Sequence, residues 1–209
     1  MFDEGTKRHE WTSSENYPNF TAKRPHLERL MHVIALLKPK NILEVGSGIG
    51  KNLFAIAGTF PDIHLTGLEL SHSGARAAQA IQSLEEMPTD NAIYGAWPHR
   101  DSKAFKRINF QLGSAKQIPF TDNSFDLVFS CMAIEQMKLI QDEVFQEIAR
   151  VCSGHAALIE PFSDFTQTEL QRLSALKKNH FCAPISCLRA MDFLRLQNFP
   201  AGYRKLMKE

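Results

Sequence analysis

The sequence predicts an α/β fold in which a single, mostly parallel sheet carries helices on both faces. Apolar strand-like segments alternate with helix-like segments from about residue 25 to residue 162. The first strand-like segment ends in three glycines at alternate positions, which is typical of a strand-to-helix turn that receives a ligand. The length of 209 residues suits one such domain better than two. Together these observations indicate a doubly wound, Rossmann-like sheet.

The first half of the chain supplies an arm and the opening strand–helix units. Residues 1–24 are polar with scattered aromatic side chains, and we expect an N-terminal arm or cap. Apolar residues then recur at helical spacing between Pro25, which is predicted to open a helix, and Pro39, which ends it. The segments predicted next are strands at 41–45 and 63–70, and helices at 50–60 and 71–87, the last with Ser71 as its N-cap.

The second half predicts three further strands and is less regular beyond Pro161. Turn residues fill much of 88–106. A helix is expected near 166–179, and a shortened or remodelled sheet edge is expected in the C-terminal part, 163–209. The strands of the 25–162 core are predicted at 107–113, 124–130 and 155–162, its last helix at 142–152, and weak candidates for closing strands are 181–186 and 193–199.

Charge and cysteine content exclude several classes of function. Lys and Arg number 24 against 23 Asp and Glu, so no global field draws the protein to nucleic acid or to an anionic membrane. We see no secretory signal and no apolar run long enough to span a bilayer. The four cysteines form no C-x-x-C and predict reduced thiols in the cytoplasm. The eight histidines lack zinc-binding spacing, so no metal site is expected.

The stretch ILEVGSGIGKN, residues 42–52, is compatible with different ligands to different degrees. A nucleoside triphosphate loop would need a glycine in place of Val45 and a hydroxyl in place of Asn52. A dinucleotide loop would need its third glycine at Lys51, one residue after Gly50, so that reading is weakened but stays open. A tight turn without any ligand is a further alternative.

Two stretches, LEVGSGIG and GSAKQIPFTDNSFDLVFS, resemble in order and spacing the motifs of class I S-adenosylmethionine-dependent methyltransferases. The resemblance covers roughly residues 41–162 and implies an enzyme that transfers a methyl group from S-adenosylmethionine to a small-molecule acceptor. A carboxylate beside the loop suits a sulfonium cation better than a pyrophosphate. The residues predicted to bind this cofactor are Glu44, Gly46, Ser47, Gly48, Gly50, Glu69, Leu70, Ser114, Ala115, Ser130 and Cys131.

Three positions refine the predicted cofactor site. Glu69 ends the second predicted strand, where a carboxylate can accept hydrogen bonds from both ribose hydroxyls. Ser114 stands where the family usually has an acid that binds the amine of adenine, and a hydroxyl accepts such a bond without charge assistance. In SCMAIEQM, residues 130–137, Gln136 replaces a histidine that is common in the family.

The base and the acceptor are less well defined by the sequence. Candidate general bases are Glu135 and Glu160, followed by His155 and Tyr17, and Glu160 is preferred because it ends the fifth predicted strand. Trp11, Tyr17, Tyr94, Trp97 and the loop after Pro161 are expected to form a pocket for an apolar or planar small molecule. The basic cluster of His99, Arg100, Lys103, Lys106 and Arg107 predicts either a contact for an anionic substrate or a solvated face.

Two alternatives remain open. Ser114, Gln136 and the irregular C-terminal part are also compatible with a catalytically silent relative that binds the cofactor and serves as a partner subunit. The glycine spacing leaves room for a nicotinamide-dependent reductase. The sequence predicts no oligomeric state.

Overall fold

The computed structural model describes residues 20–87, 100–160, 193–199 and 203–208. The helices are α1 (Phe20–Leu37), α2 (Lys51–Thr59), α3 (His72–Ser83) and α5 (Gln141–Val151), with short 3₁₀ helices η2 (Ala104–Arg107), η3 (Ile134–Gln136) and η4 (Lys138–Ile140). The strands are β1 (Asn41–Val45), β2 (His64–Glu69), β3 (Asn109–Leu112), β4 (Phe125–Cys131), β5 (Cys152–Ile159), β6 (Phe193–Phe199) and β7 (Tyr203–Lys208).

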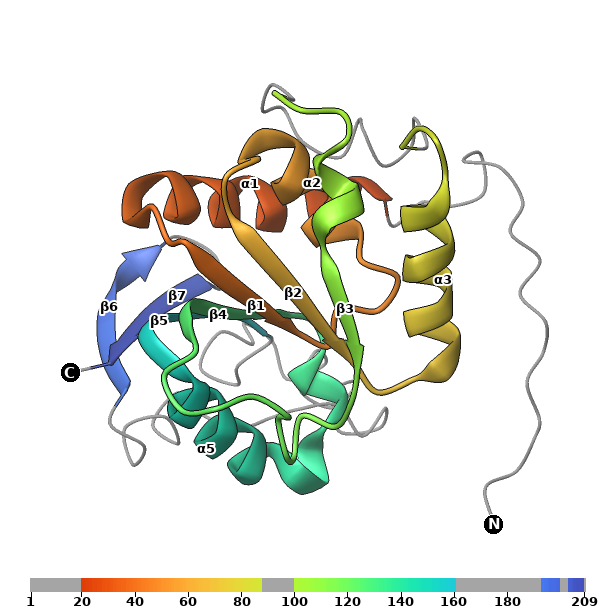
Figure 1. The fold of residues 1–209 in the computed structure, drawn as a ribbon. Coiled ribbons are helices and arrows are strands. Elements are labelled where there is room, and N and C mark those ends of the chain that lie inside the picture. Colours follow the sequence, from red (N-terminus) through yellow and green to blue (C-terminus); the bar gives the residue numbers. More distant parts are fainter. Residues whose placement is uncertain (1–19, 88–99, 161–192, 200–202, 209) are drawn as a thin grey trace, which may run out of the picture.

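The strands form one sheet in the order β3-β2-β1-β4-β5-β7-β6, shown in Figure 1. β1 to β5 pair in parallel, while β7 runs antiparallel to both β5 and β6. The strand order reverses between β1 and β4, which lie side by side although β2 and β3 separate them in the chain. The predicted doubly wound α/β class is therefore confirmed, and ligands of such sheets bind at the carboxyl ends of the strands beside this reversal.

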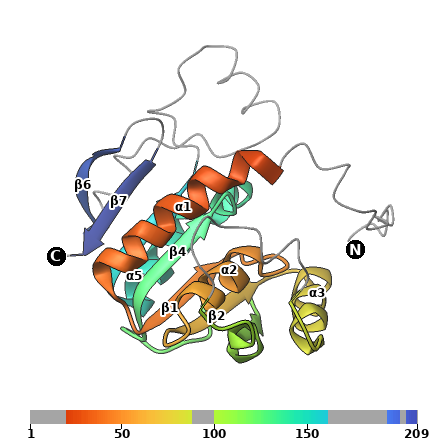
Figure 2. The same ribbon diagram turned by 90° about the horizontal axis from the view of Figure 1, so that it is seen from above.

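Side chains that alternate along the strands divide the core into two layers. Ile42 of β1 and Phe129 of β4 pack with buried residues of α1 and α2, whereas Leu43 and Val128 pack with the apolar side of α5. This alternation follows from the two-residue period of a strand, and both faces are apolar because both are covered. Figure 2 shows α1, α2 and α3 on one side of the sheet, with α5 on the other.

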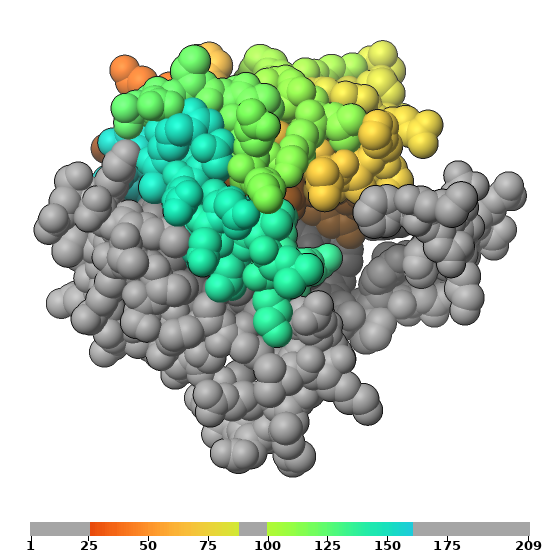
Figure 3. Space-filling model, turned by 90° about the horizontal axis from the view of Figure 1, so that it is seen from below, coloured from red at the N-terminus to blue at the C-terminus, as the bar shows by residue number. Residues whose placement is uncertain are grey.

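The loop between β3 and β4 is fastened to α5 through Arg150. Its guanidinium donates to the carbonyl oxygens of Ile118 and Phe120, each at 2.9 Å, and to the carboxylate of Glu147. Glu147 accepts in turn from the amide of Ile118 at 2.7 Å, and its Arg150 partner lowers the pKa of the Glu147 carboxyl. Figure 3 views this face, with the loop in green beside α5 in teal. This network therefore joins the loop to the helix without using the apolar core.

Several predicted element boundaries were wrong, among them the end of α3, predicted at residue 87 and found at Ser83. The first helix begins at Phe20, so Pro25 lies inside it and does not open it. The fifth strand begins at Cys152, directly after α5, and not at residue 155, because Ser153 and Gly154 are part of the strand. A side chain at Gly154 would lie 2.4 Å from the carbonyl oxygen of Asp126, so the glycine is required by close approach of two strands. Ser71 is confirmed as the N-cap of α3, since its hydroxyl accepts from the amide of Gly74.

Both strands of the antiparallel sheet edge are present. The candidate strand at 193–199 is β6, and its partner β7, which the sequence analysis missed, inserts between β5 and β6. The edge is therefore not shortened by loss of a strand. The arm at 1–19, the segments at 88–99 and 161–192, and with them the expected helix at 166–179 and strand at 181–186, lie outside the described residues.

Candidate functional site

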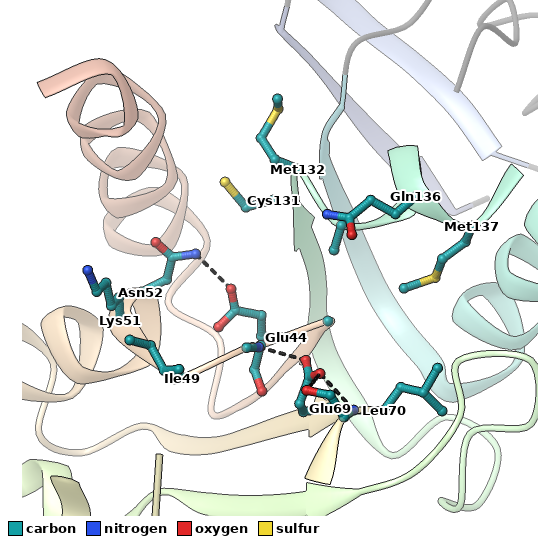
Figure 4. A pocket seen from close by; sticks show the side chains of 15 residues that line it. Glu44, Ile49, Lys51, Asn52, Glu69, Leu70, Cys131, Met132, Gln136 and Met137 are labelled. Carbon is teal, nitrogen blue, oxygen red and sulfur yellow. Dashed lines mark hydrogen bonds between the residues drawn. The ribbon is translucent and has the colours of Figure 1, made fainter. Parts of the chain in front are cut away.

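A cavity of about 590 Å³ opens at the carboxyl ends of β1, β2 and β4, beside the reversal of strand order. Its size falls within the range of about 300–1,000 Å³ that small-molecule sites have. Figure 4 shows it from close by. The residues that line it are Glu44, Gly46, Ser47, Gly48, Ile49, Lys51, Asn52, Glu69, Leu70, Ser71, Cys131, Met132, Ala133, Gln136 and Met137.

The glycine loop forms the floor of the cavity. Gly46, Gly48 and Gly50 all have positive φ, at 76°, 55° and 81°, which is a conformation that glycine adopts without steric cost. A side chain at Gly46 would lie 2.4 Å from Cβ of Ala133, whereas one at Gly48 would meet nothing within 4 Å. Packing against Ala133 therefore requires a glycine at position 46. Gly48 lines the cavity, and the space where its side chain would lie is open.

Glu44 supplies a buried carboxylate at the end of β1. Its side chain is only 1% exposed, and Oε1 accepts a hydrogen bond of 2.7 Å from Nδ2 of Asn52 in the first turn of α2. Burial of a carboxylate is costly unless hydrogen bonds or a positive charge compensate it. The hydroxyl of Ser47, which is also buried, has no hydrogen-bond partner among the described residues. Both groups suit a polar ligand that carries positive charge.

Glu69 is held at the opposite side of the floor by protein donors. Oε2 accepts from the amide of Gly48 at 2.8 Å, and Oε1 accepts from the amide and the hydroxyl of Ser71 at 2.8 and 2.6 Å. A carboxylate has about four acceptor positions, so three are used in this conformation and one remains for a ligand hydroxyl. The hydroxyl of Ser71 also caps α3, which couples the orientation of Glu69 to that helix.

The segment from Cys131 to Met137 forms the wall that faces the glycine loop. In Figure 4 the sulfur atoms of Cys131, Met132 and Met137 lie on this side, and the amide of Gln136 points into the space between them and Glu44. Thioether side chains are polarizable and adapt to apolar ligands of different shape. The cavity thus has a polar floor around Glu44 and Glu69 and a soft, mostly apolar wall.

Four of the residues predicted to bind the cofactor do not line this cavity. A side chain at Gly50 would meet the ring of Phe110 at 2.6 Å, so this glycine faces the core. Ala115 packs in the core with α5, and the hydroxyl of Ser114 accepts from the amide of Lys116 within its own turn. The hydroxyl of Ser130 donates to Glu160, away from the cavity. The contacts of Ser114 and Ala115 with adenine stay predictions. The seven that do line it are Glu44, Gly46, Ser47, Gly48, Glu69, Leu70 and Cys131.

The candidate bases lie apart from the cavity surface. Glu160 is 3% exposed and does not line the cavity. Burial raises the pKa of its carboxyl to about 7, although its hydrogen bonds act in the opposite direction and lower the pKa. Glu135 is buried in η3, and His155 lies early in β5, away from the carboxyl end. Tyr17 lies outside the described residues. Neither Glu135 nor Glu160 lines the cavity formed by the described residues, and a role of either as a base stays a prediction.

The structure adds residues that the sequence analysis did not assign to the site. The sequence analysis singled out Gln136 within residues 130–137, but Met132, Ala133 and Met137, which also line the cavity, were not assigned to it. Asn52 appeared only as a mismatch to the triphosphate loop, whereas here it is the partner of Glu44. An amide at the second position of α2 can reach back to the end of β1, because the glycine turn between them is tight.

The basic cluster does not face the cavity. Arg107 pairs with Asp101 at 3.2 Å and donates to the carbonyl oxygen of Pro61, while Lys106 pairs with Glu85 at 3.7 Å. These contacts lie near His64, at the amino end of β2, whereas the cavity lies at the carboxyl end. The structure therefore does not support a contact of Arg100, Lys103, Lys106 and Arg107 with an anionic substrate in this cavity. Their position fits the alternative prediction, a charged surface exposed to solvent. His99, Tyr94, Trp97 and Trp11 lie outside the described residues.

Comparison with known proteins identifies the family. Residues 43–159, more than half of the chain, match a family model described as a methyltransferase domain. The chain belongs to this family. The matched range includes β1 to β5 apart from the first two residues of β1, and with them all residues that line the cavity. The resemblance seen in the sequence motifs is therefore confirmed.

Among curated relatives, the methyltransferase domain is similar to norajmaline N-methyltransferase from Rauvolfia serpentina, with 27% identity over 178 residues, 78% of this chain and 53% of that protein. It is 32% identical to O-methyltransferase resE from Aspergillus sclerotiorum over 114 residues, 54% of this chain and 35% of that protein. The chain thus spans about half, or less, of the length of these relatives. By name, the first is an N-methyltransferase and the second an O-methyltransferase.

A solved structure shows the same fold. Magnesium protoporphyrin IX methyltransferase from Synechocystis PCC 6803, solved with bound SAH, aligns with a TM-score of 0.60 at 12% identity, over 90% of this chain and 84% of that one. At this identity the likeness concerns the fold alone.

Two further observations concern only the part of the chain that the structure describes. None of its helices combines the length and the apolar character needed to cross a bilayer. In the same residues, no group of three or more His, Cys, Asp or Glu side chains is arranged to hold a metal ion.

Proposed function

We propose that this methyltransferase domain binds S-adenosylmethionine in the cavity at the carboxyl ends of β1, β2 and β4 and transfers its methyl group to a small-molecule acceptor. The observation that carries the proposal is the buried carboxylate of Glu44 beside an open glycine loop, in a chain of this family. The cavity volume of about 590 Å³ suits a nucleoside-sized ligand.

The residues present fit this cofactor. Glu44 supplies negative charge next to the loop, and Ser47 supplies a buried hydroxyl without a partner among the described residues. Glu69 retains one acceptor position for a ribose hydroxyl, and Leu70, 66% exposed at the edge of the cavity, supplies an apolar surface for a base. When bound, S-adenosylmethionine supplies an activated methyl group on a sulfonium. The protein's part is to orient the reactants and exclude water, which can contribute about 7–11 kcal/mol to catalysis.

The same charges argue against a nicotinamide-dependent reductase. A pyrophosphate beside the loop would meet the carboxylate of Glu44 across a buried, low-dielectric space, where like charges repel strongly. Glu69 does not separate the two cofactors, because a carboxylate at this strand end can also bind the ribose of a dinucleotide. Dinucleotide sites instead offer loop amides and a helix N-terminus to the phosphates.

The wall from Cys131 to Met137 supports an acceptor that is largely apolar. Cys131, Met132 and Met137 present sulfur atoms to the cavity, and Gln136 is the polar side chain that this wall directs into it. An amide donates and accepts hydrogen bonds but does not take up a proton near neutral pH. Gln136 would therefore orient the acceptor and would not act as its general base.

The proposal is tested by ligand binding and by turnover. Isothermal titration should detect S-adenosylhomocysteine and not NADH; selective binding of NADH would contradict the proposal. Incubation with methyl-labelled S-adenosylmethionine and panels of small amines, phenols and thiols should then yield a labelled product. Binding of S-adenosylhomocysteine without transfer to any acceptor would favour the catalytically silent relative.

Glu69→Ala is expected to weaken S-adenosylhomocysteine binding by about 1–3 kcal/mol, because a charge-assisted hydrogen bond to the ligand is lost. It also releases the amide of Gly48 and the hydroxyl of Ser71. Titration calorimetry measures the effect, and Glu86→Ala, at an exposed acid beyond α3, is the control that should leave the affinity unchanged. Equal affinity of the Glu69 variant and the unaltered protein would remove this residue from the site.

A further inference from the structure

The wall of the cavity turns sharply where β4 ends. Met132 has a φ of 56°, in the left-handed region that costs a residue other than glycine about 1–2 kcal/mol. Its amide donates to the carbonyl oxygen of Ile159 at 2.9 Å. Such a conformation persists only when surrounding contacts hold it. The contacts that hold the next residues are therefore of interest.

The carboxylate of Glu160 binds the three amides that follow. Oε1 accepts from Ala133 and Ile134, each at 3.2 Å, and Oε2 accepts from Glu135 at 3.1 Å. Oε1 also accepts from the hydroxyl of Ser130 at 2.8 Å. Together with the Ile159 carbonyl, the end of β5 thus binds four consecutive amides, from residue 132 to residue 135.

This arrangement presses the wall against the glycine loop. Ala133 lies so close that its Cβ would be 2.4 Å from a side chain at Gly46. The same turn directs Met132, Gln136 and Met137 to the cavity. A shift of the 132–135 backbone would therefore change both the width of the cavity at the loop and the groups that line it.

We infer that Glu160 is a positioning residue: it fixes the Cys131–Met137 wall of the cofactor cavity through backbone hydrogen bonds and sets ligand affinity without contacting the ligand. The inference deepens the proposed function and rests on it for the identity of the ligand. This role differs from the predicted role as a base, because the buried carboxylate lies behind the wall and not on the surface of the described cavity. A neutral amide at this position would keep the acceptor oxygen but lose the acceptor for Glu135.

Two substitutions at Glu160 remove different numbers of its hydrogen-bond acceptors. At pH 8, where the Glu160 carboxyl is ionised, Glu160→Gln is expected to weaken S-adenosylhomocysteine binding about threefold and Glu160→Ala about tenfold or more. Glutamine leaves one of the three backbone amides without an acceptor, and alanine leaves all three without one. Hydrogen exchange should become faster at the amides of residues 133–135 in the same order. Partial rescue by glutamine relative to alanine is the signature of hydrogen bonding, since the two differ in acceptor capacity.

The matched control lies at the other end of β4. Asp126 also binds two backbone amides, those of Lys40 and Asn41, through one carboxylate oxygen, at 2.8 and 2.9 Å. Asparagine keeps one acceptor oxygen, so Asp126→Asn should lower stability only through the lost charge and should leave S-adenosylhomocysteine affinity and exchange at 133–135 unchanged. Ser130→Ala removes only the hydroxyl contact of Glu160 and should leave the amides protected.

The inference would be overturned if a folded Glu160→Ala protein bound S-adenosylhomocysteine as tightly as the unaltered protein, or if Asp126→Asn weakened binding equally. If alanine prevents folding, the Glu160→Gln and Asp126→Asn comparison decides it alone. Failure of the proposed function has a different outcome: the unaltered protein would not bind S-adenosylhomocysteine at all. The exchange measurement would then still report whether Glu160 holds the wall.

Discussion

Gly46→Ala is expected to lower the free energy of unfolding by about 2–5 kcal/mol, against about 1–2 kcal/mol for Gly48→Ala. Both glycines have positive φ, so both variants carry the strain of an L-residue in the left-handed region. The difference is steric: Cβ at position 46 would lie 2.4 Å from Cβ of Ala133, while Cβ at position 48 would enter open space. The measurement is urea or thermal unfolding of both variants beside the unaltered protein.

A second substitution isolates the steric part of this effect. In an Ala133→Gly background the atoms nearest to a side chain at Gly46 are at 3.7 and 3.8 Å, which is ordinary contact. Gly46→Ala should then cost no more than Gly48→Ala, and the recovered energy is the coupling between the two positions. Equal costs of the two glycine variants in the unaltered background would show that the wall does not press on the loop.

Stability is expected to fall by about 3 kcal/mol between pH 4.5 and pH 7 through Glu160 alone. Burial raises the pKa of this carboxyl from 4.5 to about 7 in the folded protein. Between these values the native state holds a proton that the unfolded chain has released. The stabilisation is therefore complete below pH 4.5 and is lost as the pH rises through about 7.

The measurement is urea unfolding between pH 4.5 and pH 8 for the unaltered protein and for Glu160→Gln. Other titrating groups contribute equally to both, so the difference between the two curves reports Glu160. The glutamine variant carries a constant offset from its lost hydrogen bond, and the quantity to compare is the slope with pH. Parallel curves would show that Glu160 is ionised in the folded protein throughout this range.

Much of the fold follows from local patterns in the sequence. Short apolar runs mark β1 and β4, three- and four-residue spacing marks α1, and Ser71 marks the start of α3. These signals arise between neighbours in the chain, so the sequence displays them directly. The missed features have non-local causes: Gly154 lies inside β5 and not before it, where the Asp126 backbone passes close to it.

The sequence by itself also determined the polar floor of the site, since the glycine loop and the two glutamates lie at strand ends that any parallel sheet brings together. Only the tertiary structure decided which residues face the cavity. Gly50 faces Phe110, and Ser130 faces Glu160 thirty residues away, although both stand beside cavity residues in the chain. Orientation depends on contacts between distant segments, and local periodicity carries no record of these. For the same reason Glu160 reads as a strand-end acid in the sequence but holds the cavity wall in the fold.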